Sequence, residues 1–144
     1  MSLVYKIDQS NQADILNHLQ QCDATFLANL KKEVDIEAYS NKLFTNAMRF
    51  EAWDGEKLVG IVAVYLNEAN FAYLTNVSVD QNYTGQRIAS TLMDQCIAFC
   101  RNSKIAFIRL EVKMENTPAI QLYTKYNFEK RESTDTTQFM ELTL

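Results

Sequence analysis

The chain has 144 residues, the size of one ordinary domain; 47% are hydrophobic, 22% are charged, and only three glycines and one proline occur, which excludes long disordered linkers. No apolar run is long enough to cross a membrane, the N-terminus lacks the pattern of a signal peptide, and a net charge of −4 excludes an overall basic surface for nucleic acid. We therefore expect one cytoplasmic domain over residues 1–144, with neither a membrane nor a nucleic acid as partner.

The first third of the chain predicts a strand followed by helices. Asn11 is a suitable N-cap for a helix with apolar residues at helical spacing, and a second amphipathic pattern begins near Asp35. The segment between them, 23–34, mixes apolar and charged residues and predicts no definite element. The expected elements are a strand at 4–8 and helices at 11–22 and 35–47.

Strand signals dominate the middle of the chain. Asp54-Gly55 is a strong hairpin-turn signal, residues 68–70 indicate another turn, and the expected strands span 49–53, 58–66 and 71–79. Strict alternation along the third of these strands assigns its side chains to two faces. One face would carry Tyr73, Thr75, Val77 and Val79, and the other Leu74, Asn76 and Ser78.

The last third of the chain alternates helices and strands. Ile88, Leu92, Cys96 and Cys100 recur at helical spacing, and Pro118 suits the first turn of a later helix. Helices are expected at 88–100 and 117–126, and strands at 106–114, 128–132 and 138–144. A strand–helix–strand unit over 71–114 implies a right-handed crossover with parallel pairing, while the hairpins imply antiparallel pairing. The order predicts an α/β (α+β) fold, a mixed sheet with helices on its faces.

The three cysteines do not predict a disulfide framework, because their number is odd. Cys96 and Cys100 share one helix face, which is compatible with a metal pair or with burial in the core. Cys22 lies apart, and the single histidine is His18. Since structural zinc needs four ligands, the core interpretation is favoured and no metal is expected.

The loop between the strand at 71–79 and the next helix has features of an anion site. N–H groups at a helix N-terminus lack internal partners, and the small residues Gly85 and Ala89 let the backbone approach a phosphate. Arg87 adds a cation. The glycines of a Rossmann fingerprint and of a Walker A loop are absent. The loop therefore predicts anion binding of another kind or an ordinary glycine-containing connection.

Residues 79–89 resemble motif A of the GNAT superfamily of acyl-CoA-dependent N-acetyltransferases, Val-x-Pro-x-Tyr-Arg-Gly-x-Gly-Ile-Gly/Ala. The matching residues are Val79, Tyr83, Gly85, Ile88 and Ala89, whereas Gln81, Thr84 and Arg87 replace the Pro, the Arg and the middle Gly. The resemblance implies that backbone N–H groups here bind the pyrophosphate of CoA, with the Arg87 side chain beside the phosphates or in solvent. The implied cofactor-binding residues of this loop are Thr84, Gly85, Gln86, Arg87, Ile88 and Ala89.

Residues 116–128 resemble a second GNAT motif, Asn-x-x-Ala-x-x-Leu-Tyr-x-x-x-Gly-Phe. Only the Gly departs, as Asn127, and Asn is the next-best residue for the left-handed end of a helix. The resemblance covers about residues 48–132. It implies a central, mostly antiparallel sheet of about seven strands, with a splayed parallel pair and helices on both faces.

The resemblance further implies transfer of an acetyl group from acetyl-CoA to a primary amine by direct attack in a ternary complex. It assigns Tyr123 as the acid, since a phenol pKa of about 10 suits a thiol of about 8.5, whereas helical periodicity alone favours a core position. It also implies that pantetheine pairs with the strand edge at Val77, Ser78 and Val79. Asn116 would contact pantetheine and can also cap its helix.

The acceptor side leaves several interpretations open. By resemblance, Tyr73 and Thr75 lie where family members often place a Glu or His, so both are expected to contact the substrate, although neither is a good base. Glu111 lies twelve residues before Tyr123, the base–acid spacing of GNAT members that acetylate a ribosomal protein's N-terminus. Glu111 is either the base or, with Arg109 and Lys113, part of a solvated charge ladder. The neutral amine could also bind without a base.

Residues 22–50 are expected to form a helical wall over the acceptor site. Its candidate lining aromatics are Phe26, Tyr39, Phe50 and Trp53, and its candidate partners for an ammonium are Asp23, Glu33, Asp35 and Glu51. We expect a small-molecule amine as the acceptor. The alternatives are a peptide or protein N-acetyltransferase and a non-catalytic acyl-CoA-binding sensor, and the sequence leaves a homodimer open.

Overall fold

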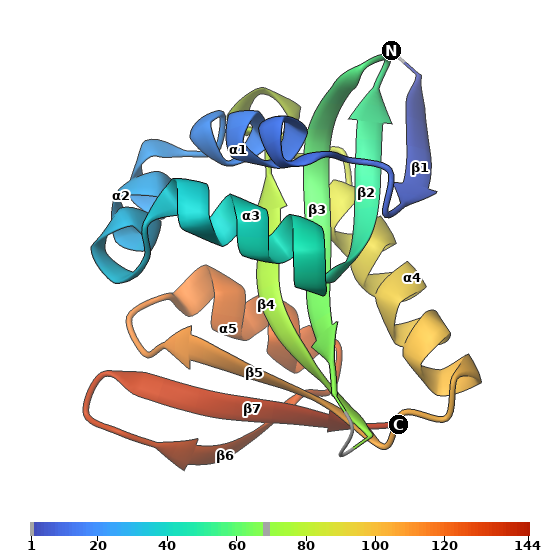
Figure 1. Cartoon of the computed structure of the whole chain (residues 1–144). Coiled ribbons are helices and arrows are strands. Elements are labelled where there is room, and N and C mark those ends of the chain that lie inside the picture. Colours follow the sequence, from blue (N-terminus) through green and yellow to red (C-terminus); the bar gives the residue numbers. More distant parts are fainter. Residues whose placement is uncertain (1, 68–69) are drawn as a thin grey trace.

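Strands in the order β1-β2-β3-β4-β5-β7-β6 form one seven-stranded sheet in the computed structural model of the chain (Figure 1). The structure describes residues 2–67 and 70–144. β4 and β5 pair in parallel, and the other neighbouring strands pair antiparallel. The predicted mixed sheet is confirmed. The strands are β1 Leu3–Ile7, β2 Met48–Asp54, β3 Lys57–Leu66, β4 Phe71–Val79, β5 Phe107–Lys113, β6 Glu129–Ser133 and β7 Thr137–Thr143.

Side-chain caps start the helices of the N-terminal half. Asn11 caps α1 by accepting the Asp14 N–H at 2.8 Å, and Asp35 caps α3 in the same way. Segment 23–34, for which the sequence predicted no element, forms α2, because Asp23 accepts the first free N–H groups of that helix. The helices are α1 Gln12–Gln20, α2 Ala24–Glu33, α3 Ile36–Asn46, α4 Ile88–Asn102 and α5 Thr117–Lys125, with a 3-10 turn, η1, at Gln81–Tyr83.

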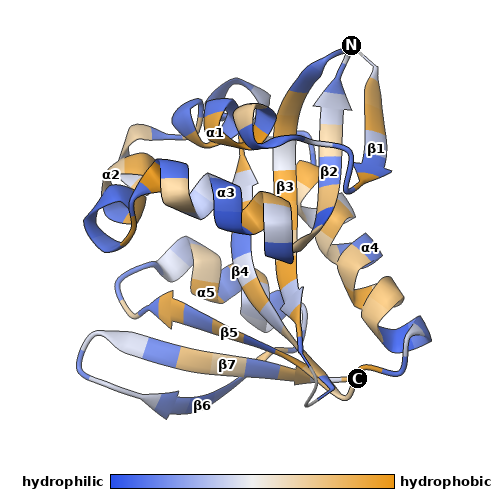
Figure 2. Ribbon diagram, viewed as in Figure 1, coloured by the Kyte–Doolittle hydropathy of each residue, from blue (hydrophilic) through white to orange (hydrophobic). Residues whose placement is uncertain are grey.

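Helices cover both faces of the sheet: α1 and α3 cross in front of β2, β3 and β4 in Figure 1, and α4 lies behind. The larger apolar core packs between the sheet and α4 and includes Cys96 and Cys100, which confirms the core interpretation of both thiols. The smaller core packs between the sheet and the pair α1 and α3. Figure 2 shows the middle of β3 as apolar and β6 as hydrophilic, as expected for a central strand and an edge strand.

Gly60 of β3 fixes how closely α4 approaches the sheet. A Cβ atom at this position would lie only 2.5 Å from Cγ2 of Ile88, the first residue of α4. The missing side chain therefore lets the N-terminus of α4 seat directly on the sheet, at the end of β4.

Turns connect the strands largely as expected. Gly55 has a φ of 60° in the β2–β3 hairpin, which confirms the turn predicted at Asp54-Gly55. Of the turn predicted at 68–70, residues 68 and 69 lie outside the described residues, and Asn70 has a φ of 63°. Within the described part of the chain, no helix has the length and apolar character required to cross a membrane.

Candidate active site

β4 and β5 diverge halfway along their length. Their pairing runs from Phe71 opposite Phe107 to Leu74 opposite Leu110, yet both strands continue for several residues. The Asp80 N–H donates to the Val59 carbonyl at 2.8 Å, so alternate residues of β4 bond to β3. By this alternation the N–H groups of Val77 and Val79 point away from β3, toward the space between the diverging strands. A free backbone edge results at two of the residues predicted to pair with pantetheine.

The predicted face assignment along β4 is wrong beyond Thr75, because a β-bulge interrupts the strand. Ala63 pairs with Asn76 while Val64 pairs with Leu74, which leaves Thr75 as the extra residue. Val77 therefore packs with Leu74 in the core beneath α4, and Thr75 shares its face with Asn76. Strict alternation could not locate this inserted residue, since the sequence carries no marker for it.

A chain of polar contacts follows the α1 and α3 side of β4. The Tyr39 hydroxyl donates a hydrogen bond to the Thr75 carbonyl at 3.0 Å and accepts one from Nδ2 of Asn76 at 3.4 Å. The Ser78 hydroxyl donates to Asn76 Oδ1 at 2.7 Å and lies 2.9 Å from His18 Nε2. Burial lowers the pKa of His18 to about 4, so the ring is neutral.

The loop predicted to bind phosphate leads from β4 into α4. Thr84, Gly85, Gln86 and Arg87 are exposed, Gly85 has a φ of 79°, and Arg87 is left-handed with a φ of 60°. Among the described residues no side chain caps α4, so the first N–H groups of this helix can meet an anion. The side chain of Ile88 is buried, which leaves its backbone as the part able to contact a ligand.

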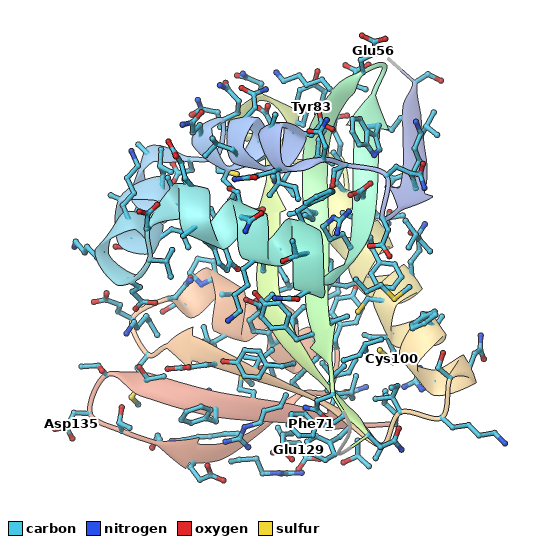
Figure 3. All side chains as sticks on the ribbon, in the orientation of Figure 1. Glu56, Phe71, Tyr83, Cys100, Glu129 and Asp135 are labelled. Atoms are coloured by element: carbon cyan, nitrogen blue, oxygen red, sulfur yellow. The ribbon has the colours of Figure 1, made fainter. Side chains whose placement is uncertain are left out.

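Anchors hold this loop to the β2–β3 hairpin. The Tyr83 hydroxyl donates to Asp54 Oδ2 at 2.6 Å, and Tyr83 lies at the hairpin end of the sheet in Figure 3. Asp80 is fully buried, accepts the Asn82 N–H at 2.8 Å, and lies 3.2 Å from the ammonium of Lys57. The motif residue Tyr83 thus has a structural role that fixes the loop.

A shallow pocket of about 380 Å³ lies beside the loop, between α4 and α5. Its lining residues are Arg87, Ser90, Asp94, Lys125 and Tyr126. The Tyr126 hydroxyl donates to the Ser90 carbonyl at 3.0 Å and ties the two helices together. Two cations against one carboxylate suit an anionic ligand group. The sequence motifs did not identify Ser90 or Lys125, because both read as ordinary exposed helix positions.

Tyr123 lies on α5, behind the diverging strands. Asn116 caps α5 by accepting the Ala119 N–H at 3.3 Å, and Asn127 ends the segment in the expected left-handed conformation, with a φ of 72°. The half-buried Tyr123 ring packs 5.7 Å from the ring of Phe128. Burial raises the pKa of Tyr123 to about 12, and no described group hydrogen-bonds its hydroxyl. The geometry leaves a protonated phenol available as a donor.

Glu111 and Tyr73 lie on the opposite face of the sheet from Tyr123. The Tyr73 hydroxyl donates to Glu111 Oε2 at 3.3 Å, and burial and the Glu111 charge raise the pKa of Tyr73 to about 12. The neighbours of Glu111 in the predicted charge ladder pair elsewhere: Arg109 with Glu132 and Glu141, and Lys113 with Glu33. Glu111 is thus exposed, with a phenol as its hydrogen-bond donor.

Most of the candidate acceptor-wall residues have structural roles. Asp23 and Asp35 cap α2 and α3, and Phe50 and Trp53 are buried in the two cores. Glu51 is fully buried and accepts hydrogen bonds from Arg49, Trp53 and the backbone of residues 9 and 10. Asp23, Glu33 and Asp35 are exposed, and the Glu33 carboxylate lies 2.8 Å from the ammonium of Lys113.

Curated relatives match only part of the chain. L-amino acid N-acetyltransferase AaaT of Escherichia coli (strain K12) is 39% identical over 54 residues, which are 37% of this chain and 33% of that protein. The match to a second relative, from Bacillus subtilis (strain 168), spans 38% of its length. The chain thus spans well under half the length of these relatives.

Solved structures match the fold over nearly the whole chain. PaiA N-acetyltransferase of Thermoplasma acidophilum, in complex with coenzyme A, has a TM-score of 0.77 at 17% identity and covers 100% of both chains. Ribosomal-protein-S18-alanine N-acetyltransferase of Escherichia coli has a TM-score of 0.77 at 19% identity, over 97% of this chain and 94% of that one. The model of the acetyltransferase (GNAT) family matches residues 13–128, which include both motifs, and the chain belongs to this family.

Proposed function

We propose that the chain is an acetyltransferase that moves the acetyl group of acetyl-CoA to the primary amine of a small molecule, by direct attack in a ternary complex. The observation that carries the proposal is the divergence of β4 and β5. It leaves the N–H groups of Val77 and Val79 unpaired at the strand end that leads into the uncapped N-terminus of α4. An extended chain with a phosphate group at one end fits such an edge.

The donor would lie along β4 and across α4. The free N–H groups of residues 84–89 suit its pyrophosphate, and Arg87 contributes charge from the rim of the adjoining pocket. A pantetheine carbonyl would accept the Val79 N–H, which leaves the Val77 N–H for the thioester, and Asn116 lies at the start of α5 on the other side of the divergence. Binding of coenzyme A by the Thermoplasma acidophilum structure supports this assignment.

The catalytic step needs a donor for the developing oxyanion and an acid for the leaving group. When bound, acetyl-CoA supplies the thioester that the neutral amine attacks. The N–H group of Val77 would donate to the carbonyl oxygen as the N–C bond forms. Tyr123 would give its proton to the sulfur as the C–S bond breaks, and its raised pKa keeps it protonated at neutral pH. The proton lost by the amine balances the proton that Tyr123 gives up.

Glu111 is the candidate base for that amine proton. Its carboxylate is exposed on the acceptor side, and its hydrogen bond from Tyr73 orients it toward the end of β4 where pairing stops. The Glu111 carboxylate would accept the amine proton and pass it on to water. Thr75, on the same face, is the neighbouring substrate contact.

The class of acceptor is proposed from the relatives and from the charges at the site. The similarity to the L-amino acid N-acetyltransferase AaaT supports a small amine, such as an amino acid, as the acceptor. The exposed carboxylates of Glu33 and Glu111 suit a cationic group. A peptide or protein N-terminus is the second candidate. It is favoured by the exposure of Glu111 on β5 and by the fold of the S18-alanine enzyme.

Thiol release from acetyl-CoA, measured over a panel of amino acids, polyamines, amino sugars and short peptides, tests the proposal. We expect Tyr123→Phe to lower kcat by about a hundredfold while the KM for acetyl-CoA stays within about twofold, because only the leaving-group proton is lost. Glu111→Gln should lower kcat by about tenfold or more, and most strongly at low pH, where the amine is protonated. Tyr5→Phe, at the other edge of the sheet, is the matched control.

Different outcomes separate the alternatives. Full activity of Tyr123→Phe would remove the acid role, and an unchanged kcat and pH profile in Glu111→Gln would assign Glu111 to the charge ladder. Tight binding of acetyl-CoA without thiol release for any amine would favour the non-catalytic sensor.

A further inference from the structure

The β-bulge at Thr75 leaves one backbone carbonyl of β4 outside the sheet ladder. β3 pairs with Leu74 and Asn76 on either side, and the Thr75 carbonyl accepts the hydroxyl of Tyr39, from α3, at 3.0 Å. An unpaired carbonyl in a largely buried position costs free energy, so this side-chain donor stabilises the bulge.

Tyr39 holds the bulge through several atoms at once. Its hydroxyl also lies 2.9 Å from Thr75 Oγ1 and accepts Asn76 Nδ2 at 3.4 Å. Its ring packs against the core between α3 and the sheet, where α3 is itself fixed by the Asp35 cap. The hydroxyl therefore reaches the bulge from a rigid element rather than from a loop.

The bulge determines which N–H groups of β4 face the diverging strands. With the extra residue in place, Asn76 and Ser78 bond to β3, and Val77 and Val79 point outward. A shift of one residue in the register would exchange these pairs and turn the outward donors inward. The interaction that fixes the bulge therefore also fixes the direction of the N–H groups that would bind the thioester and the pantetheine.

We infer that Tyr39 is a positioning residue, whose hydroxyl holds the Thr75 bulge and so aims the N–H group of Val77 at the acetyl carbonyl and that of Val79 at the pantetheine arm. The inference rests on the proposed acetyl transfer. In this proposal α3 has two roles. It covers the acceptor side, and through Tyr39 it sets the geometry of the N–H group that would bind the oxyanion. A Tyr39 that served only as core packing would affect stability alone.

Tyr39→Phe tests the role, and Tyr65→Phe is a matched control. Tyr65 packs against the same core and lies near the Thr75 side chain, but no hydrogen bond joins its hydroxyl to the Thr75 carbonyl. We expect Tyr39→Phe to lower kcat by about tenfold to a hundredfold, with the KM for acetyl-CoA within about twofold, because the donors are misaimed but not removed. Tyr65→Phe should keep the wild-type kcat.

A second measurement does not depend on the stability of the variant. It is the infrared spectrum of bound acetyl-CoA labelled with carbon-13 at the acetyl carbonyl. Hydrogen bonds to the carbonyl lower its stretching frequency, so we expect a downshift in the wild type that shrinks in Tyr39→Phe and persists in Tyr65→Phe. An unchanged downshift and kcat in Tyr39→Phe would overturn the positioning role and leave the proposed function intact. Failure of the wild type to bind acetyl-CoA in calorimetry would overturn both.

Discussion

At the scale of single residues, His18 shows how a buried titratable group makes stability depend on pH. Its pKa is lowered to about 4, mainly by burial, and the nearby charges of Asp80 and Lys57 act in opposite directions. Nε2 of the neutral ring lies 2.9 Å from the Ser78 hydroxyl in the polar chain beneath α1. In the unfolded chain a histidine titrates at about 6.5, so between the two values only the unfolded state takes up the proton.

The free energy of unfolding should therefore fall as the pH drops from about 6.5 to about 4, by at most roughly 3 kcal/mol from this residue. His18→Gln keeps a hydrogen-bonding group for Ser78 but cannot titrate. Urea unfolding measures the free energy of unfolding of both proteins at each pH. Between about pH 6.5 and pH 4 we expect this free energy to fall for the wild type, relative to the variant, by at most roughly 3 kcal/mol. Other groups cancel in the difference, and parallel pH curves for the two proteins would contradict the prediction.

The residues of the proposed site differ in how visible they are in the sequence. Tyr123 and Asn127 belong to one spaced motif: Tyr123 lies on the predicted helix, and Asn127 follows that helix with the predicted positive φ. Tyr39 and His18 come from segments that share no motif with β4, and their contacts with Thr75 and Ser78 span 36 and 60 residues. Such pairs depend on how helices pack over the sheet, which local patterns do not encode.

At the scale of elements, the loop before α4 carries an unusual residue at its most constrained position. Arg87 has a φ of 60°, where the family motif has glycine, and a left-handed L-residue costs about 1 kcal/mol or more. Arg87→Gly and Arg87→Ala both remove the guanidinium, but only glycine relieves this strain. We therefore expect the free energy of unfolding, measured by thermal unfolding, to be about 1 kcal/mol higher for Arg87→Gly than for Arg87→Ala.

Both Arg87 variants should bind acetyl-CoA about threefold to tenfold more weakly in calorimetry, and less so at high salt, because a screened charge contact is lost. Arg101→Ala is the control, since Arg101 lies roughly 20 Å further along α4. Equal weakening in all three variants would point to the overall charge of the protein instead of a contact made by Arg87.

Elements with turn residues or clear periodicity could be predicted from the sequence, whereas features that depend on tertiary packing could not. The Asp54-Gly55 hairpin and the strand–helix–strand unit around α4 carry turn residues and clear periodicity. α2 has no buried residue and is held by its Asp23 cap, so it has little apolar pattern to detect. The bulge in β4 inserts one residue without a glycine or proline, and alternation therefore assigned Val77 and Val79 to the wrong face.

At the scale of the whole molecule, the sheet consists of two wings joined by a short parallel contact. β1 to β4 form one wing and β5, β7 and β6 the other, and the join runs only from Phe71 to Leu74 of β4. Each wing packs on the same core beneath α4, which keeps them together where the strands diverge. A ligand bound between the diverging strands would add a second link between the wings.

Amide hydrogen exchange followed by NMR can detect that link. In the free protein the N–H groups of Val77 and Val79 lack strand partners and should exchange quickly, whereas those of Asn76 and Ser78 bond to β3 and should be protected. Acetyl-CoA should slow exchange at Val77 and Val79 by about tenfold or more, because its thioester and pantetheine carbonyls supply the missing acceptors.

A truncated ligand separates pairing along β4 from binding at the phosphate loop. Adenosine 3′,5′-bisphosphate keeps phosphate groups but lacks pantetheine, so it should slow exchange in residues 85–90 and leave Val77 and Val79 unchanged. Protection of Val77 and Val79 by this fragment would mean that the wings close as a unit when the loop is filled. Protection by acetyl-CoA alone would mean that the ligand itself pairs with β4 between the two wings. This is the result we expect, because β4 and β5 no longer pair at Val77 and Val79.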